Sequence, residues 1–289
     1  MIATQLHQNS KVVEVRKLLG KPFFEAPNCL IYHQDCLEGM RLLNYELIDL
    51  TITSPPYNIG KEYERVLPLS DYITWCETWI YEVYRLTKPN GTFWLNLGYT
   101  SLPDTAKAIP LPYLLWSVIP FFLMQEIVWN YGAGVAGKKF FSPRNEKFLW
   151  FVKNQEEYIF NLDAVRDPNV KYPNQKKNGK IKVNPLGKNP TDVWQFPKVT
   201  SGKNRSSTER TAHPAQFPIA VIDRIIRASS NVGQTILDPF MGSGTCAEVA
   251  LRNQRAIIGF EINPMYCEVI ANRLESLMTQ TTLFDETRF

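Results

Sequence analysis

Cysteine and histidine are scarce in this chain. Its 289 residues contain five cysteines and three histidines, and the cysteines are odd in number with no Cys-x-x-Cys spacing. This pattern predicts neither a disulfide framework nor a zinc site, and we expect no bound metal. Cys246 follows a glycine-rich turn, where we interpret it as small-residue packing rather than as a nucleophile.

Long apolar runs, low-complexity tracts and internal repeats are also lacking. Charged residues interrupt the first twenty positions, which excludes the continuous core of a secretory signal. The longest apolar run, 109–124, contains three prolines and is short for a bilayer span, so we expect a buried helix that leads into a strand. We therefore expect a cytoplasmic protein with no membrane partner.

What the chain does have is an alternation of strand-like and helix-like segments. We predict strands at 29–33, 47–53, 92–97, 125–130, 147–152, 235–237 and 256–260. Between them we predict helices at 71–86, 218–229, 245–253 and 264–278, the first capped by Ser70 or Asp71. Strands that alternate with helices indicate an α/β fold with a doubly wound, mostly parallel sheet.

Two short motifs follow predicted strands at opposite ends of the chain. The first is Thr53-Ser54-Pro55-Pro56-Tyr57, and the second is Asp238-Pro239-Phe240-Met241-Gly242-Ser243-Gly244-Thr245. The second motif lacks the lysine of a phosphate-binding P-loop. Its glycines permit close backbone approach, and the helix that starts near Thr245 can receive a carboxylate at its N-terminus.

An acidic residue closes the next strand after the glycine-rich motif. Glu261 lies 23 residues beyond Asp238. In doubly wound nucleotide sites this position usually binds the hydroxyls of a ribose. The alternative is a carboxylate that only caps the helix beginning at Pro264.

Basic residues are concentrated in one region rich in Asn, Pro, Gly and Lys. Residues 171–208 contain nine Lys or Arg and one Asp, a net charge of +8 in a chain whose total is +4, so the remainder carries −4. A charge run is commonly a solvated loop. Because this chain also carries the two motifs, contact with a phosphate backbone explains the concentration of positive charge better than a solvated loop does.

Together these segments resemble the amino-methyltransferases of DNA, which use S-adenosylmethionine. The order of the motifs, catalytic first and cofactor last, is that of the family's β group, and implies a circularly permuted Rossmann-like fold. The resemblance implies that Ser54 and the carbonyl of Pro55 accept the protons of the target amine. Pro56 would restrain the turn, and Tyr57 would stack on a base that has left the duplex.

The same resemblance implies the cofactor site and the division of the chain. The implied cofactor residues are Asp35, Phe217, Asp238, Pro239, Phe240, Gly242, Ser243, Gly244, Thr245 and Glu261. Residues 1–152 and 211–289 would form the methyltransferase domain, and 153–210 would be a target-recognition insertion. The expected partners are double-stranded DNA, contacted by Lys176, Lys177, Lys180 and Lys182, and a restriction endonuclease for the same site, with the enzyme a monomer or homodimer.

Serine in the catalytic motif favours methylation of the N4 of cytosine, because the family's adenine enzymes usually carry aspartate there. Methylation of the N6 of adenine is the alternative within the class. Outside the class, the chain could be a DNA-binding protein that keeps the fold without turnover, or an enzyme acting on RNA or protein. Residues 58–65, after Tyr57, are either a mobile loop that closes over the base or an ordinary surface connection.

Overall fold

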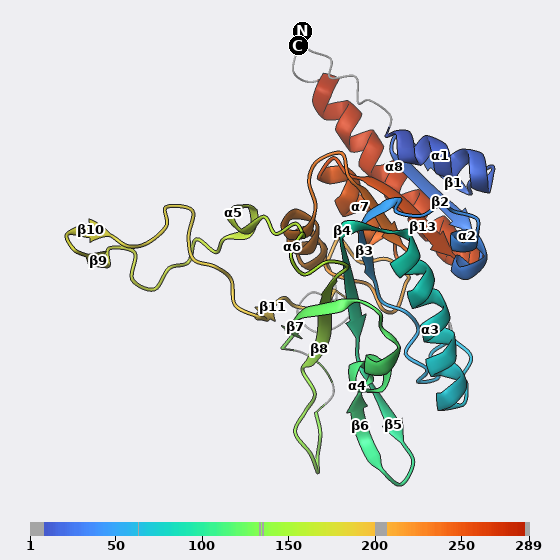
Figure 1. The fold of residues 1–289 in the computed structure, drawn as a ribbon, viewed down its shortest axis with the longest axis horizontal. Helices are drawn as coiled ribbons and strands as arrows, with labels where there is room; N and C mark the ends of the chain where they lie inside the picture. Colours follow the sequence, from blue (N-terminus) through green and yellow to red (C-terminus); the bar gives the residue numbers. More distant parts are fainter. Residues whose placement is uncertain (1–8, 63, 133, 135, 200–206, 287–289) are drawn as a thin grey trace.

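A nine-stranded sheet forms the centre of the computed structural model, which describes residues 9–62, 64–132, 134, 136–199 and 207–286 (Figure 1). The strand order is β1-β2-β13-β12-β3-β4-β8-β7-β11. The strands are β1 (Phe24–Ala26), β2 (Cys29–His33), β3 (Ile48–Thr53), β4 (Thr87–Leu97), β7 (Phe122–Asn130), β8 (Asn145–Val152), β11 (Val193–Gln195), β12 (Thr235–Asp238) and β13 (Ala256–Glu261). The block from β2 to β4 is parallel throughout, and β8 is antiparallel to both its neighbours. The predicted doubly wound, mostly parallel sheet is confirmed.

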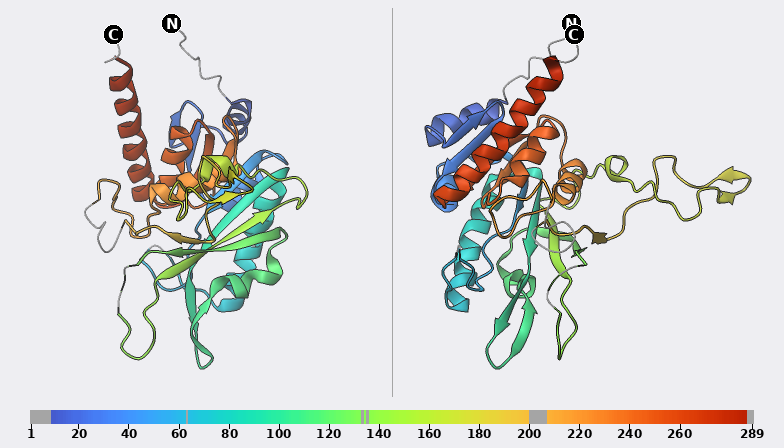
Figure 2. Two further views of the ribbon diagram at one scale, coloured as in Figure 1. Left: turned by 90° about the vertical axis from the view of Figure 1, so that its left-hand side faces the viewer. Right: turned by 180° about the vertical axis from the view of Figure 1, so that it is seen from behind.

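Helices cover both faces of this sheet (Figure 2). Alternation along β2 shows why: Leu30 and Tyr32 pack in one buried cluster, and Cys29 and Ile31 pack in the other. The first cluster includes residues of α1 (Ser10–Leu19), α2 (Cys36–Arg41), α3 (Leu69–Leu86) and α4 (Leu111–Leu115). The second includes residues of α6 (Ile219–Ser229), α7 (Thr245–Arg252) and α8 (Pro264–Glu286).

The chain winds in opposite directions from two neighbouring central strands. From β3 it passes through α3 to β4 on one side, and from β12 it passes through α7 to β13 on the other. Because β3 and β12 are adjacent and parallel, their carboxyl ends meet at one edge of the sheet. Such a switch point leaves a crevice in which α/β proteins bind their ligands.

All seven predicted strands are present, although several begin earlier than expected. The predicted helix over 71–86 begins at Leu69, and the prediction of a Ser70 or Asp71 cap is wrong. Pro68 occupies the cap position in an extended conformation, and Ser70 donates its hydroxyl hydrogen bond to Asp71 instead. The run 109–124 does contain a short helix, α4, followed by a 3-10 turn η1 (Trp116–Val118) and then β7.

Two antiparallel hairpins lie outside the main sheet. One, β5 (Tyr99–Leu102) with β6 (Ala106–Pro110), extends beyond the carboxyl end of β4 (Figure 1). The other, β9 (Lys176–Lys177) with β10 (Lys180–Ile181), ends a long arm that leads away from the body of the protein beyond the short helix α5 (Leu162–Val165) (Figure 1). Asn178 and Gly179 form its tip with φ of 52° and 77°, the left-handed geometry of a type I′ turn.

Within the described part of the chain, no helix is both long and apolar enough to span a lipid bilayer.

Candidate active site

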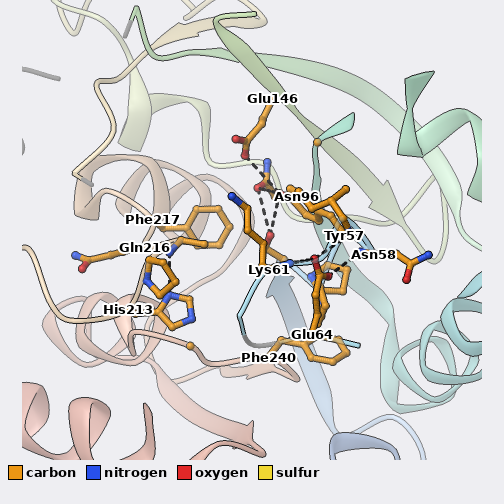
Figure 3. A pocket seen from close by; sticks show the side chains of 18 of the residues that line it. Tyr57, Asn58, Lys61, Glu64, Asn96, Glu146, His213, Gln216, Phe217 and Phe240 are labelled. Atoms are coloured by element: carbon orange, nitrogen blue, oxygen red, sulfur yellow. Dashed lines mark hydrogen bonds between the residues drawn. The ribbon is translucent and has the colours of Figure 1, made fainter. Parts of the chain in front are cut away.

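A cavity of about 1230 Å³ opens at the carboxyl ends of the central strands and is lined by both sequence motifs. Sites for one small molecule commonly measure about 300–1000 Å³, so this cavity has room for more than one. We call Ser54, Pro55, Pro56, Tyr57 and Asn96 its catalytic end. We call residues 238–245 with Glu261 its cofactor end. Figure 3 shows Tyr57, Asn96 and Glu146 on one side of the cavity and His213, Gln216 and Phe217 on another.

Asp238 joins the two ends. Its Oδ1 accepts a hydrogen bond from Thr53 Oγ1 at 2.7 Å and another from the Phe240 backbone N–H at 3.1 Å. Because the carboxyl group is fully buried, loss of water raises its pKa from 3.8 to about 6. Asp238 therefore connects the end of the strand that precedes Ser54 to the turn that contains Phe240. Asp238 and Thr53 are 185 residues apart in the sequence.

At the catalytic end, three side chains form a short chain of hydrogen bonds, and Figure 3 shows two of them, Tyr57 and Asn96. The Ser54 hydroxyl lies 3.0 Å from Tyr57 Oη and 3.4 Å from Asn96 Oδ1, and the Tyr57 hydroxyl donates to Asn96 Oδ1 at 2.8 Å. Asn96 is almost fully buried, and its amide nitrogen donates to the Lys147 carbonyl at 3.0 Å. That bond turns the amide oxygen toward Ser54 and Tyr57, so Asn96 determines the direction in which the hydroxyl protons point.

An ion pair lies beyond Tyr57. Glu146 Oε2 is 3.4 Å from the Tyr57 hydroxyl, and Glu146 Oε1 is 2.5 Å from Lys198 Nζ. The Lys198 ammonium also lies over the Tyr131 ring, 4.0 Å from its centroid. The sequence did not identify Asn96, Glu146 or Lys198 as site residues. A polar residue inside an otherwise apolar run, as Asn96 is within residues 93–97, was the available signal.

Close packing fixes the Tyr57 ring and the proline turn. A Cβ added at Gly98 would come within 2.7 Å of the Tyr57 ring, so a larger residue there would displace it. The Tyr72 hydroxyl donates to the Pro56 carbonyl at 2.8 Å. The loop that follows is held internally, because the Glu64 carboxylate accepts from the backbone N–H groups of Asn58, Ile59 and Lys61.

The cofactor end is centred on a backbone turn. Gly242 and Gly244 have φ of 53° and 74°, a region that favours glycine. A Cβ at Gly242 would lie 3.0 Å from the His213 ring, and one at Gly244 would lie 3.2 Å from Ile270. The turn therefore requires both glycines, and α7 begins directly after it.

Glu261 holds the same turn through its carboxylate. Oε2 accepts from the Gly242 N–H at 2.8 Å, and Oε1 accepts from the Asn263 N–H at 2.9 Å. Burial raises the pKa of this carboxyl group. Glu261 thus links the end of β13 to the turn after β12, whereas the first turn of α8 is capped by Asn263, whose Oδ1 accepts from the Met265 N–H at 2.9 Å.

Arg273 of α8 contacts the turn through its guanidinium, and no sequence motif identified it as a site residue. Its guanidinium is buried, donates to the Ser243 carbonyl at 2.8 Å and to Thr245 Oγ1 at 3.0 Å, and pairs with Glu248 at 2.5 Å. The Ser243 and Thr245 hydroxyls are 3.0 Å apart. A surface arginine and a buried one look alike in sequence, which is why this contact needed the fold.

The remaining predicted cofactor residues surround the turn. Asp35 lines the cavity, and its Oδ1 accepts from the Leu37 and Glu38 N–H groups, so it also caps α2. Phe240 packs edge to face on Trp79, and Phe217 packs on Phe148. Pro239 lines the cavity as well.

Two titratable side chains near the turn, His213 and Cys246, have structural rather than catalytic environments. Burial lowers the pKa of His213 from 6.5 to about 4, and its Nδ1 accepts from the Ala215 N–H, so the ring is neutral and structural near pH 7. Burial raises the pKa of the Cys246 thiol well above its usual value, which agrees with a packing role.

The basic region divides into exposed and paired residues. Lys176, Lys177, Lys180 and Lys182 are exposed on the β9–β10 arm. Two others make ion pairs within the protein, Lys188 with Asp167 at 3.1 Å and Lys198 with Glu146. Lys203 and Arg205 lie outside the described residues. The cations available to a partner are therefore fewer than the composition suggested.

A doubly wound sheet with a glycine-rich turn at its switch point and a Ser-Pro-Pro-Tyr turn beside it is the arrangement expected of the methyltransferase class. A family model described as DNA methylase, for the N6 and N4 enzymes, matches residues 48–273. The chain belongs to this family of DNA methyltransferases.

Individual relatives agree. The chain is 59% identical over 268 residues to the type II methyltransferase M.ScaI of Streptomyces caespitosus, covering 93% of this chain and 88% of the relative. It is 33% identical to the DNA adenine methyltransferase YhdJ of Escherichia coli K12, covering 85% and 82%. Among solved structures it is similar to the cytosine-N4-specific PvuII DNA methyltransferase, with a TM-score of 0.67, 23% identity and coverage of 87% and 88%.

Proposed function

We propose that this protein transfers a methyl group from S-adenosylmethionine to the N4 of cytosine in double-stranded DNA, at a specific site and on a base that has left the helix. The observation that carries the proposal is the Ser54–Tyr57–Asn96 chain of neutral groups at the end of the cavity. It offers hydrogen-bond acceptors to an exocyclic amine, and the adjoining cofactor end offers a cradle for the methyl donor.

The cofactor end fits S-adenosylmethionine. The positive φ of Gly242 and Gly244 shapes the turn that leads into α7, and the carboxylate of the methionine moiety would be favoured at this helix N-terminus. Glu261 can accept hydrogen bonds from the ribose hydroxyls, and Asp35, Phe217, Pro239 and Phe240 lie around the same space. When bound there, the cofactor supplies an electrophilic methyl group on a sulfonium.

The chain's own residues would prepare the amine. Its nitrogen lone pair is delocalised into the base, and acceptors for both amine protons make the nitrogen more tetrahedral and more nucleophilic. Asn96 directs the Ser54 proton toward the Tyr57 and Asn96 oxygens, which leaves Ser54 Oγ lone pairs to accept a hydrogen bond from one amine N–H. The carbonyl of Pro55 would accept the other, held in place by two consecutive prolines.

The neutral Ser54 hydroxyl favours cytosine over adenine. The relatives point both ways, since one is named as a DNA adenine methyltransferase and one similar structure is named as cytosine-N4-specific. Mass spectrometry of nucleosides from DNA methylated by the purified protein decides between them, with Ser54→Ala as the matched inactive control. We expect N4-methylcytosine; N6-methyladenine as sole product would reject the base assignment and keep the reaction class.

Lys176, Lys177, Lys180 and Lys182 are proposed to contact DNA phosphates from the β9–β10 arm, which lies within residues 153–210, the proposed target-recognition insertion. A restriction endonuclease for the same site is the proposed partner, in keeping with the type II names of the relatives. Labelled-methyl incorporation into DNA, RNA and protein tests the substrate class. Incorporation into none of them would favour a non-catalytic DNA-binding protein, and sequencing of DNA from expressing cells would identify the site.

A further inference from the structure

The loop between β7 and β8 presents an unusual side chain at the rim of the cavity. Phe141 is fully exposed, at 101%, and it belongs to the same lining as Ser54 and Tyr57. The neighbouring Phe140 is also exposed, at 50%, and lines the same cavity, so the two rings form a contiguous apolar surface of the kind that contacts a partner.

The loop is held in shape around this residue. Ser142 Oγ accepts from the Gly137 N–H at 2.8 Å, and a Cβ at Gly137 would come within 2.4 Å of the Phe140 carbonyl. Residues 137–142 therefore form a tight turn that requires glycine at its base. Phe140, next to Phe141, lies under the Lys107 ammonium of β6, 4.2 Å from the ring centroid. This contact joins the loop to the β5–β6 hairpin, and both extend from the same end of the sheet (Figures 1 and 2).

The surroundings of Phe141 favour a polyanion as its partner. Lys138 and Lys139 are exposed on the same turn, and Lys107 is fixed beside it. An apolar ring projecting from a cationic turn combines phosphate attraction with a surface that can stack on a base. Resting on the proposed function, we propose that Phe141 inserts into the DNA duplex and fills the space left by the base that enters the cavity.

A wedge of this kind makes a specific kinetic prediction. It compensates for the loss of stacking when a paired base leaves the helix, and it has little to compensate for when the base is already unpaired. Phe141→Ala should therefore lower kcat/KM on a fully paired duplex by about tenfold, as expected for the loss of one base–aromatic stack. On the same duplex with a mismatch or an abasic site opposite the target base, the variant should approach the parent.

The experiment uses the full chain and an unmethylated oligonucleotide duplex that contains the enzyme's target site, in fully paired and mismatched forms. Phe141→Trp should retain activity on both. Phe122→Ala removes an exposed phenylalanine, 49% exposed, that does not line the cavity, and should match the parent on both. Equal activity of Phe141→Ala and the parent on the paired duplex, or an equal loss on both duplexes, would overturn the proposal. Absence of methylation by the parent itself would instead reject the proposed function.

Discussion

The two ends of the cavity are held in place by different means. The catalytic end is a set of side chains that bond one another, with Asn96 orienting Ser54 and Tyr57. The cofactor end is a backbone turn whose shape depends on two left-handed glycines and on the buried carboxylate of Glu261. The first presents chemistry that one substitution can delete with little effect on folding. The second is built into the core, so its substitutions alter stability as well as binding.

The largest effect is expected at the catalytic end. Tyr57→Ala should reduce methyl transfer by at least about 100-fold, because it removes a stack worth about 1–3 kcal/mol and a hydroxyl that orders Ser54. Cofactor affinity, measured by calorimetric titration, should stay near that of the parent. Tyr57→Phe keeps the ring and should lose less. A loss of cofactor binding in Tyr57→Ala would show that the two ends are not separable.

A pH experiment examines the buried groups of the cofactor end. His213 has a folded pKa of about 4 against 6.5, so the unfolded chain takes up its proton first and the native state loses stability as pH falls from 6.5 to 4. His213→Asn removes this loss while keeping an acceptor for the Ala215 N–H. Its free energy of unfolding relative to the parent should rise on acidification by on the order of 3 kcal/mol.

Asp238 acts in the opposite direction over nearly the same range. Its folded pKa of about 6 lies above 3.8, so it contributes stability at low pH that is lost as pH rises from 3.8 to 6. Its contribution partly cancels that of His213 in the parent. Denaturant titrations at pH 4.5, 5.5 and 7 measure the free energy of unfolding of the parent and of His213→Asn. If the two free energies change with pH in parallel, the lowered pKa assigned to His213 is wrong.

Glu261→Ala should affect both stability and binding. It leaves the Gly242 and Asn263 N–H groups without their acceptor, at a cost of about 1–3 kcal/mol in unfolding free energy, and it removes the proposed ribose contact. Glu261→Gln keeps one acceptor oxygen and should be milder in both respects. Thermal unfolding and cofactor titration are measured for both variants. If Glu261→Ala binds the cofactor as tightly as the parent, Glu261 does not contact the cofactor.

The smallest effect is expected on the arm, which belongs to neither end. Neutralising Lys176, Lys177, Lys180 and Lys182 together should weaken DNA binding and flatten its salt dependence, by about 0.9 in slope for each phosphate that is no longer neutralised. Cofactor affinity and kcat at saturating DNA should not change. Fluorescence anisotropy at several salt concentrations is the measurement. An unchanged slope would make this region a solvated loop.

The sequence alone determined seven of the nine strands of the main sheet, the helices α3, α6, α7 and α8, and the reaction class, but it did not predict β1, β11 or the two hairpins. The features that it did predict are local patterns: apolar segments of strand length, the Ser54–Tyr57 turn and the Gly242–Gly244 turn. They depend on steric constraints between neighbouring residues, so they can be predicted without the fold. The sequence also indicated correctly that Cys246 packs in the core. The cap at Ser70 or Asp71 was misjudged because two competing acceptors and Pro68 lie within one turn.

Tertiary structure alone decided how the site is held together. Asp238 meets Thr53 across 185 residues, Asn96 faces Ser54 from a neighbouring strand, and Arg273 reaches the Ser243 carbonyl from the last helix. Each contact depends on strand order and on the rotation of a helix about its axis, which residue spacing along one element does not specify. The physical reason is that hydrogen bonds act over about 3 Å in space. The chemistry of the residues was therefore readable in advance, and their partners were not.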